Sequence, residues 1–298
     1  MSSGSHGAKP RLACEIAADR VLVGRMGEDG RSLEACAVRE LAPGSVIPDL
    51  VEGNLRQRGA VREAVYETLQ SVAGRTHDVI AVVPDAAVRV VLLEFDTLPS
   101  DSEEAENVVR FRMKKSLPFD VDKARVSYDA QKSPDGVRVV AAVALASVVE
   151  DYEVAFQEAG FSPGVVLPSM LAALGAADGE RPTLVVKVDA RTTSIAILNA
   201  NQLQLFRTLE NTRGVTITGD QLAEDVYPSV VFFQDTYHLN IEQIFVAGIS
   251  DIGSAAPALR SQTGAEVQEL ITSSQLGVST GGSVPRWRMA AVVGALIS

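Results

Sequence analysis

Short apolar runs alternate along this chain with stretches in which apolar residues recur every three or four positions. Continuous apolar runs are typical of strands covered on both faces, and the wider spacing is typical of helices with one buried face. The alternation therefore predicts an α/β or α+β class. The expected strands are residues 12–16, 20–26, 79–83, 88–95, 124–130, 137–144, 164–167, 183–189, 193–198, 202–208, 243–247 and 267–270.

Helices are expected between these strands. One apolar stripe runs from Val61 to Val72, and Gly74 follows it as a stop signal. Ser100 and Glu103 have the spacing of a capping box, which predicts that Ser100 caps the next helix. The expected helices are residues 61–74, 103–117, 148–159, 170–177, 221–237, 255–262 and 287–297.

The best linker in the sequence is the polar, glycine- and proline-containing segment 176–182. A chain of 298 residues is long enough for about two domains, each with its own core. We therefore expect a flexible N-terminal segment at residues 1–10, a first domain at 11–178 and a second domain at 182–298.

Composition narrows the classes of function. The net charge of -11 argues against a broad basic face, so nucleic acid is not an expected partner. The 2 cysteines are too few for a four-ligand zinc site, and the 3 histidines are scattered, so no metal site is expected. No apolar run approaches the roughly 18 residues that cross a bilayer. We expect a soluble cytoplasmic protein that would need another protein to hold it at a membrane.

The most specific pattern is a succession of turn and helix signals in the middle of the first domain. Its parts are Leu98-Pro99, an acidic helix over 103–117, Pro118-Phe119 and a strand beginning at Ala124. This succession resembles the central region of the PilM family, the actin-like cytoplasmic proteins of type IV pilus assembly. The resemblance extends over most of residues 11–298, and Gly219-Asp220-Gln221-Leu222 is similar to a family motif in the second half.

The resemblance implies an α/β, actin-like (ribonuclease-H-like) two-domain fold, which FtsA and GspL share. It also implies an inserted strand-helix-strand-strand (SHS2-like) subdomain at about residues 88–162. In the second domain, one predicted helix after Gly219 leads directly to the strand that begins at Gln243. This domain therefore lacks most of the subdomain that covers the nucleotide in the family.

Nucleotide binding in actin-like folds uses two Asp-x-Gly hairpins and a strand that ends in Gly-Gly. The glycines are needed because a Cβ would obstruct the approach of the backbone to phosphate. Here the corresponding segments read EIAAD at 15–19, DARTT at 189–193 and AGI at 247–249. The resemblance thus implies a degenerate nucleotide site formed by Glu15, Asp189, Ala190, Arg191, Thr192 and Gly248.

The roles of these residues stay open. Arg191 could grip a phosphate or be an exposed turn residue, and Asp189 could organise Mg²⁺ or cap its turn. Catalytic residues and hydrolysis are not expected, and binding of ATP with Mg²⁺ is doubtful. A basic cluster at Arg110, Arg112, Lys114 and Lys115 is expected to be a solvated helix face, with contact to anionic lipid or an acidic partner as the alternative.

By resemblance, the leading hypothesis is a non-enzymatic scaffold at the inner membrane that binds the N-terminal tail of a PilN-like membrane protein. The tail would lie between the first domain and the inserted subdomain, with Leu98, Pro99, Pro118 and Phe119 in the partner-binding region. The alternatives are an ATP-binding actin-like switch and a GspL-like module of a type II secretion platform. The sequence leaves the pathway, the partner's sequence and the oligomeric state open.

Overall fold

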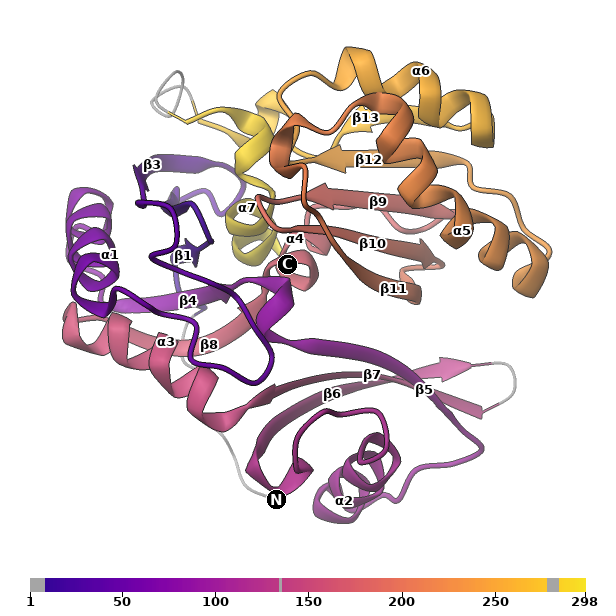
Figure 1. Cartoon of the computed structure of the whole chain (residues 1–298), viewed down its shortest axis with the longest axis horizontal. Coiled ribbons are helices and arrows are strands. Elements are labelled where there is room, and N and C mark those ends of the chain that lie inside the picture. The colour runs from indigo at the N-terminus through magenta and orange to yellow at the C-terminus, as the bar shows by residue number, and fades with distance from the viewer. Residues whose placement is uncertain (1–8, 134–135, 278–283) are drawn as a thin grey trace.

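The computed structural model describes residues 9–133, 136–277 and 284–298, which form two five-stranded sheets and one three-stranded sheet (Figure 1). Of the segment expected to be flexible, residues 1–8 lie outside the described residues. Within the described part of the chain, no helix combines the length and the apolarity needed to cross a membrane.

The first sheet has the strand order β3-β2-β1-β4-β8. Its strands are β1 (Leu12–Ile16), β2 (Arg20–Met26), β3 (Leu33–Glu40), β4 (Asp78–Val83) and β8 (Ser162–Pro168). The β1, β2 and β3 strands run antiparallel, whereas β4 is parallel to both β1 and β8. Two helices, α1 (Arg58–Val72) and α3 (Ala146–Glu158), pack on one face of this sheet.

The second sheet repeats this arrangement in the order β11-β10-β9-β12-β13. Its strands are β9 (Thr183–Val188), β10 (Thr192–Asn199), β11 (Gln202–Glu210), β12 (Gln243–Ala247) and β13 (Glu266–Glu269). The directions match those of the first sheet, with two antiparallel pairs followed by two parallel ones. The helices α5 (Gly219–Tyr237) and α6 (Ile252–Thr263) cover its outer face.

The third sheet belongs to a subdomain inserted between β4 and α3 (Figure 1). It contains β5 (Arg89–Phe95), α2 (Ser102–Met113), β6 (Ala124–Ser133) and β7 (Gly136–Leu145), which is the expected strand-helix-strand-strand succession. The prediction that Ser100 caps α2 is wrong. Asp101 is the cap, and its carboxylate accepts hydrogen bonds from the backbone N–H groups of Glu103 and Glu104, both at 3.0 Å.

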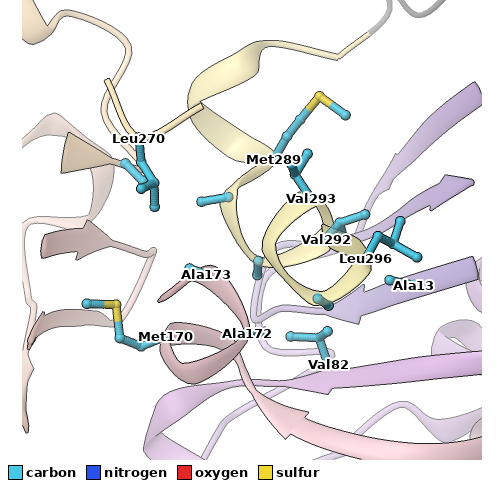
Figure 2. Packing of buried hydrophobic residues seen from close by; sticks show 14 of the residues in the cluster. Ala13, Val82, Met170, Ala172, Ala173, Leu270, Met289, Val292, Val293 and Leu296 are labelled. Carbon is cyan, nitrogen blue, oxygen red and sulfur yellow. The ribbon is translucent and has the colours of Figure 1, made fainter. Parts of the chain in front are cut away.

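Two short helices fill the space between the two large sheets: α4 (Ser169–Leu174) and α7 (Ala290–Ile297). Figure 2 shows Val292 and Leu296 of α7 beside Ala13 of the first sheet, with α4 close by. The two helices approach closely at Gly294, where an added Cβ would lie 2.2 Å from the carbonyl oxygen of Ala172. The central core therefore joins both halves of the molecule.

Candidate functional site

The turns of two hairpins, β1–β2 and β9–β10, meet between the large sheets and bring four charged side chains together. The guanidinium Nη2 of Arg20 lies 3.3 Å from Oε2 of Glu15 and 3.5 Å from Oδ1 of Asp189. Lys187 pairs with Asp189, and its Nζ lies 3.7 Å from Oε1 of Glu15. Each cation thus bridges one acid from the first sheet and one from the second.

Asp85 extends this network to α4 and β10. Its Oδ1 accepts a hydrogen bond of 2.8 Å from the backbone N–H of Met170, and its Oδ2 accepts one of 2.7 Å from the hydroxyl of Ser194. The hydroxyl of Ser169 donates to Oε1 of Glu15 at 2.5 Å. We refer to Glu15, Arg20, Asp85, Lys187 and Asp189 as the interdomain ion cluster.

The ion cluster is withdrawn from solvent. Glu15 is 1% exposed, Asp85 is 2% exposed, and Arg20 and Lys187 are each 3% exposed. Charges at such depth persist only when they are paired, because desolvation of a lone ion costs several kcal/mol. The cluster contains three acids and two bases, and Arg20 also pairs with Asp19 at 2.8 Å, so the carboxyl groups outnumber the cations.

The pKa values reflect this imbalance. Burial raises the pKa of Asp85 to about 6, although the nearby Lys187 ammonium acts to lower it. Burial acts in the same direction on Asp189, but Lys187 and Arg20 outweigh it and hold the pKa of that carboxyl below its usual value. The pKa of Lys187 is raised because the surrounding carboxylates outweigh its desolvation. Asp85 is therefore the acid that most readily carries a proton.

The ion cluster leaves little room at the two hairpin turns. A cavity of about 20 Å³ remains there, lined by Ala17, Ala18, Asp189 and Arg191 among others. A space of that size holds about one water molecule. The guanidinium of Arg20 and the ammonium of Lys187 thus lie at the two turns where a degenerate nucleotide site was expected.

The third predicted nucleotide segment is also occupied. The backbone N–H of Gly248 donates a hydrogen bond of 2.7 Å to the carbonyl oxygen of Trp287. Gly248 has a φ of 86°, and an added Cβ would lie 1.7 Å from the carbonyl oxygen of Val188. This glycine is required because the end of β12 lies directly against the end of β9.

The structure places the remaining predicted nucleotide residues in the β9–β10 turn. Ala190 and Arg191 lie at the turn, Arg191 is exposed, and Thr192 is buried. Asn211 fixes the turn through two hydrogen bonds. Its side-chain amide donates to the carbonyl oxygen of Asp189 at 3.1 Å, and its backbone N–H donates to the carbonyl oxygen of Arg191 at 2.8 Å.

Sequence reasoning missed Arg20, Asp85, Lys187 and Asn211. A signal existed for Lys187, because it is the only charged residue within the otherwise apolar or small strand β9, every residue of which is buried. A cation inside a buried strand requires a partner charge, which points to the two acids nearby. No pattern in the sequence could have joined Arg20 and Asp189, which belong to different domains.

A groove of about 1210 Å³ opens beside the ion cluster. Its walls are β5 of the inserted subdomain and β11 of the second domain, and residues 48–50 and part of α5 complete it. Both strands are at sheet edges in the described structure. Arg138 spans the groove from β7, with its Nε 2.6 Å from Oε1 of Glu94 and its Nη2 3.4 Å from the hydroxyl oxygen of Tyr237.

The residues predicted to lie in the partner-binding region lie outside this groove. Leu98 and Phe119 pack against the small core between α2 and its sheet. Pro99 is half-buried and Pro118 is exposed, and none of the four lines the groove. Among the described residues, no group of three or more His, Cys, Asp or Glu side chains could hold a metal ion.

No protein-family profile matches the chain, and no curated protein matches its sequence. Among solved structures, it is similar to a protein with the actin-like ATPase fold from Bacteroides thetaiotaomicron, with a TM-score of 0.51 and 12% identity over 94% of this chain and 96% of that one. The chain therefore has the α/β actin-like ATPase fold, as expected, with an added three-stranded subdomain.

Two further solved structures are similar to this chain. The first is the PilM-PilN type IV pilus biogenesis complex, with a TM-score of 0.79 and 19% identity over 96% of this chain and 98% of that one. The second is the cytoplasmic domain of EpsL from the type II secretion system of Vibrio cholerae, with a TM-score of 0.50 and 11% identity over 79% and 80%. The expected resemblance to PilM is thus confirmed at the level of the fold.

Proposed function

We propose that this chain is a non-enzymatic scaffold of a type IV pilus inner-membrane assembly platform. In this role it binds the N-terminal tail of a PilN-like membrane protein and is held at the cytoplasmic side of the membrane by that partner. The similarity to the PilM-PilN complex supports the proposal, because it extends over 96% of the chain with a TM-score of 0.79.

The observation that carries the binding role is the groove between β5 and β11. Unpaired strand edges offer backbone N–H and C=O groups to an extended peptide, and pockets between them select its side chains. The lining supplies an apolar anchor at Phe232, which is 51% exposed, and cationic groups at Arg89 and Arg207. Because Asp49, Glu94 and Glu210 also line the groove, its charge is mixed, and an extended tail with apolar side chains fits these walls.

The ion cluster supports the non-enzymatic part of the proposal. Binding of MgATP would require Arg20 and Lys187 to leave the two hairpin turns, and Glu15, Asp85 and Asp189 would then need new counter-charges. Separating buried ion pairs in this way costs several kcal/mol. The ATP-driven switch is therefore the weaker alternative.

The second alternative is a GspL-like module of a type II secretion platform. The similarity to the cytoplasmic domain of EpsL supports it.

Titration calorimetry with a synthetic PilN-like N-terminal tail tests the proposal. We expect one peptide to bind per chain. A peptide of the same sequence with N-methylated backbone amides at alternate positions should bind much more weakly, because it cannot pair with a strand edge. A scrambled peptide is the control. Absence of binding by the native tail, or equal binding by all three peptides, would contradict the proposal.

A further inference from the structure

The last turn of α2 carries an exposed aromatic residue with cations near it in the sequence. Phe111 is 76% exposed, whereas the other exposed large apolar side chains are between 39% and 52% exposed. Lys114 caps the C-terminus of the helix and Lys115 follows it in the turn, three and four positions after Phe111. We refer to Phe111, Arg112, Lys114 and Lys115 as the α2 tip.

The α2 tip is locally basic in an acidic protein. Residues 108–119 contain four cations and no acid, although the net charge of the chain is -11. Two of the four cations have structural contacts. Arg110 pairs with Glu106 at 2.7 Å and donates to the carbonyl oxygen of Val121 at 3.1 Å, and the Arg112 guanidinium carbon lies 5.2 Å from the centre of the Phe95 ring.

The two lysines have no such role. Across the described residues, neither Lys114 nor Lys115 lies within ion-pair distance of a carboxylate, and both are exposed. Cations are favourable at a helix C-terminus because of the helix dipole. That effect accounts for the lysines alone and gives no reason for a phenylalanine that is 76% exposed one turn before them.

The position of α2 leaves the tip accessible. Val109 and Met113 bury one side of the helix against Val139 and Ala141 of the three-stranded sheet. On the opposite face of that sheet, Val140 packs into the core shared with the second domain. The helix therefore lies on the outside of the molecule, away from the second sheet (Figure 1), so the groove and the α2 tip could be occupied together.

We infer that the α2 tip contacts an anionic phospholipid surface. Phe111 enters the boundary between headgroups and acyl chains, while Lys114 and Lys115 approach the lipid phosphates. An exposed aromatic residue flanked by lysines has the chemistry that this boundary selects. A single ring and a few cations bind weakly, so the contact orients the protein at the lipid surface and does not anchor it there.

Sedimentation with lipid vesicles at low ionic strength tests this inference. The wild-type protein should sediment with vesicles containing phosphatidylglycerol and stay in solution with pure phosphatidylcholine. The variant Lys114→Glu/Lys115→Glu should lower the partition coefficient by roughly fivefold or more for each lysine, since each basic residue near an anionic surface contributes about 1 kcal/mol. Phe111→Ser should lower it by several fold at constant charge.

Tyr66→Ser is the matched control, because Tyr66 is another exposed aromatic residue, 51% exposed on α1, and its loss should leave vesicle binding unchanged. All variants should unfold at the same temperature as the wild type. Failure of the wild type to bind anionic vesicles, or undiminished binding by the charge-reversed variant, would overturn the inference. The assay contains no partner peptide, so its outcome is independent of the proposed function.

Discussion

The ion cluster and the groove are neighbouring parts of one cleft, and Arg191 and Thr192 line both the small cavity and the groove. Yet the first is closed and the second is open. The remaining space is about 20 Å³ at the cluster and about 1210 Å³ at the groove. The chain's own ion pairs occupy the first part of the cleft, while the part between two sheet edges stays open.

The difference has a physical origin. Acids withdrawn from water need counter-charges, and buried Glu15 and half-buried Asp189 pair with Arg20 and Lys187 in the cleft, which closes it. The edges of β5 and β11 belong to different sheets and face the groove with backbone groups that water can satisfy until a peptide replaces it. The same cleft therefore contains a closed part held by ion pairs and an open groove beside it.

Removal of a cation from the ion cluster should have the largest effect and tests whether charge pairing holds this part of the cleft closed. Lys187→Met keeps the length of the side chain but leaves Glu15, Asp85 and Asp189 with Arg20 as the cation that remains in the cluster. We expect the free energy of unfolding to fall by about 3–5 kcal/mol, because removing one partner leaves an uncompensated buried charge. Urea denaturation followed by circular dichroism measures this.

Lys123→Met is the matched control, since Lys123 is exposed, and we expect it to change stability by less than about 0.5 kcal/mol. Equal stability of the two variants would show that the charges in the cluster do not hold the domains together.

The groove can be tested by removing its apolar anchor. Phe232→Ser should weaken binding of the PilN-like tail about tenfold, as expected for truncation of an aromatic anchor. Tyr227→Ser, on the same helix and similarly exposed at 52% against 51%, does not line the groove and should leave the affinity unchanged. Titration calorimetry distinguishes them, and equal effects of both substitutions would exclude this wall of the groove as the binding surface.

The protonation of Asp85 gives a smaller, pH-dependent effect. Its pKa in the folded state, about 6, lies above the unfolded value, so the folded protein holds the proton more tightly. Stability should therefore fall as the pH rises through this range. Between about pH 5.5 and about pH 8 the wild type should lose about 1 kcal/mol more than Asp85→Asn, which is nearly isosteric.

Urea unfolding of both proteins at the two pH values measures the difference, and the histidines contribute equally to each. Parallel pH profiles for the wild type and Asp85→Asn would contradict the assignment of this proton to Asp85.

The addition of nucleotide should have the smallest effect, measured on the melting temperature. A ligand that binds the folded state alone must stabilise it, so millimolar MgATP would raise the melting temperature if the closed site bound it with useful affinity. We expect a change of less than about 1 °C, measured by differential scanning fluorimetry with MgCl₂ alone as the control. A shift of several degrees would show that the ion cluster opens to admit the nucleotide.

Much of the fold was predictable because its elements carry strong local patterns. The β1 and β2 strands coincide with the predicted residues 12–16 and 20–26, and α5 begins two residues before the predicted start at 221. The prediction missed β3, an edge strand that is only partly buried along most of its length. A half-exposed edge strand with mixed residues gives a weak periodic signal.

The candidate site was predictable only in part. The sequence pointed to Glu15 and Asp189 at the ends of apolar strands, and the structure joins both through Arg20 and Lys187. Leu98 and Phe119, which were expected in the partner-binding region, pack against the core under α2. These placements depend on which faces of the sheets pack together. A local sequence pattern cannot predict that packing.

The sequence by itself determined the class of fold, the order of its elements and the absence of glycine from the turn segments 15–19 and 189–193, because strand and helix periodicity and turn chemistry act over a few residues. Only the tertiary structure decided which charges meet at these turns and where the open groove lies. Charge pairing and strand-edge exposure arise between residues that are distant in the chain, as Arg20 and Asp189 are, and they exist only once the two sheets pack together.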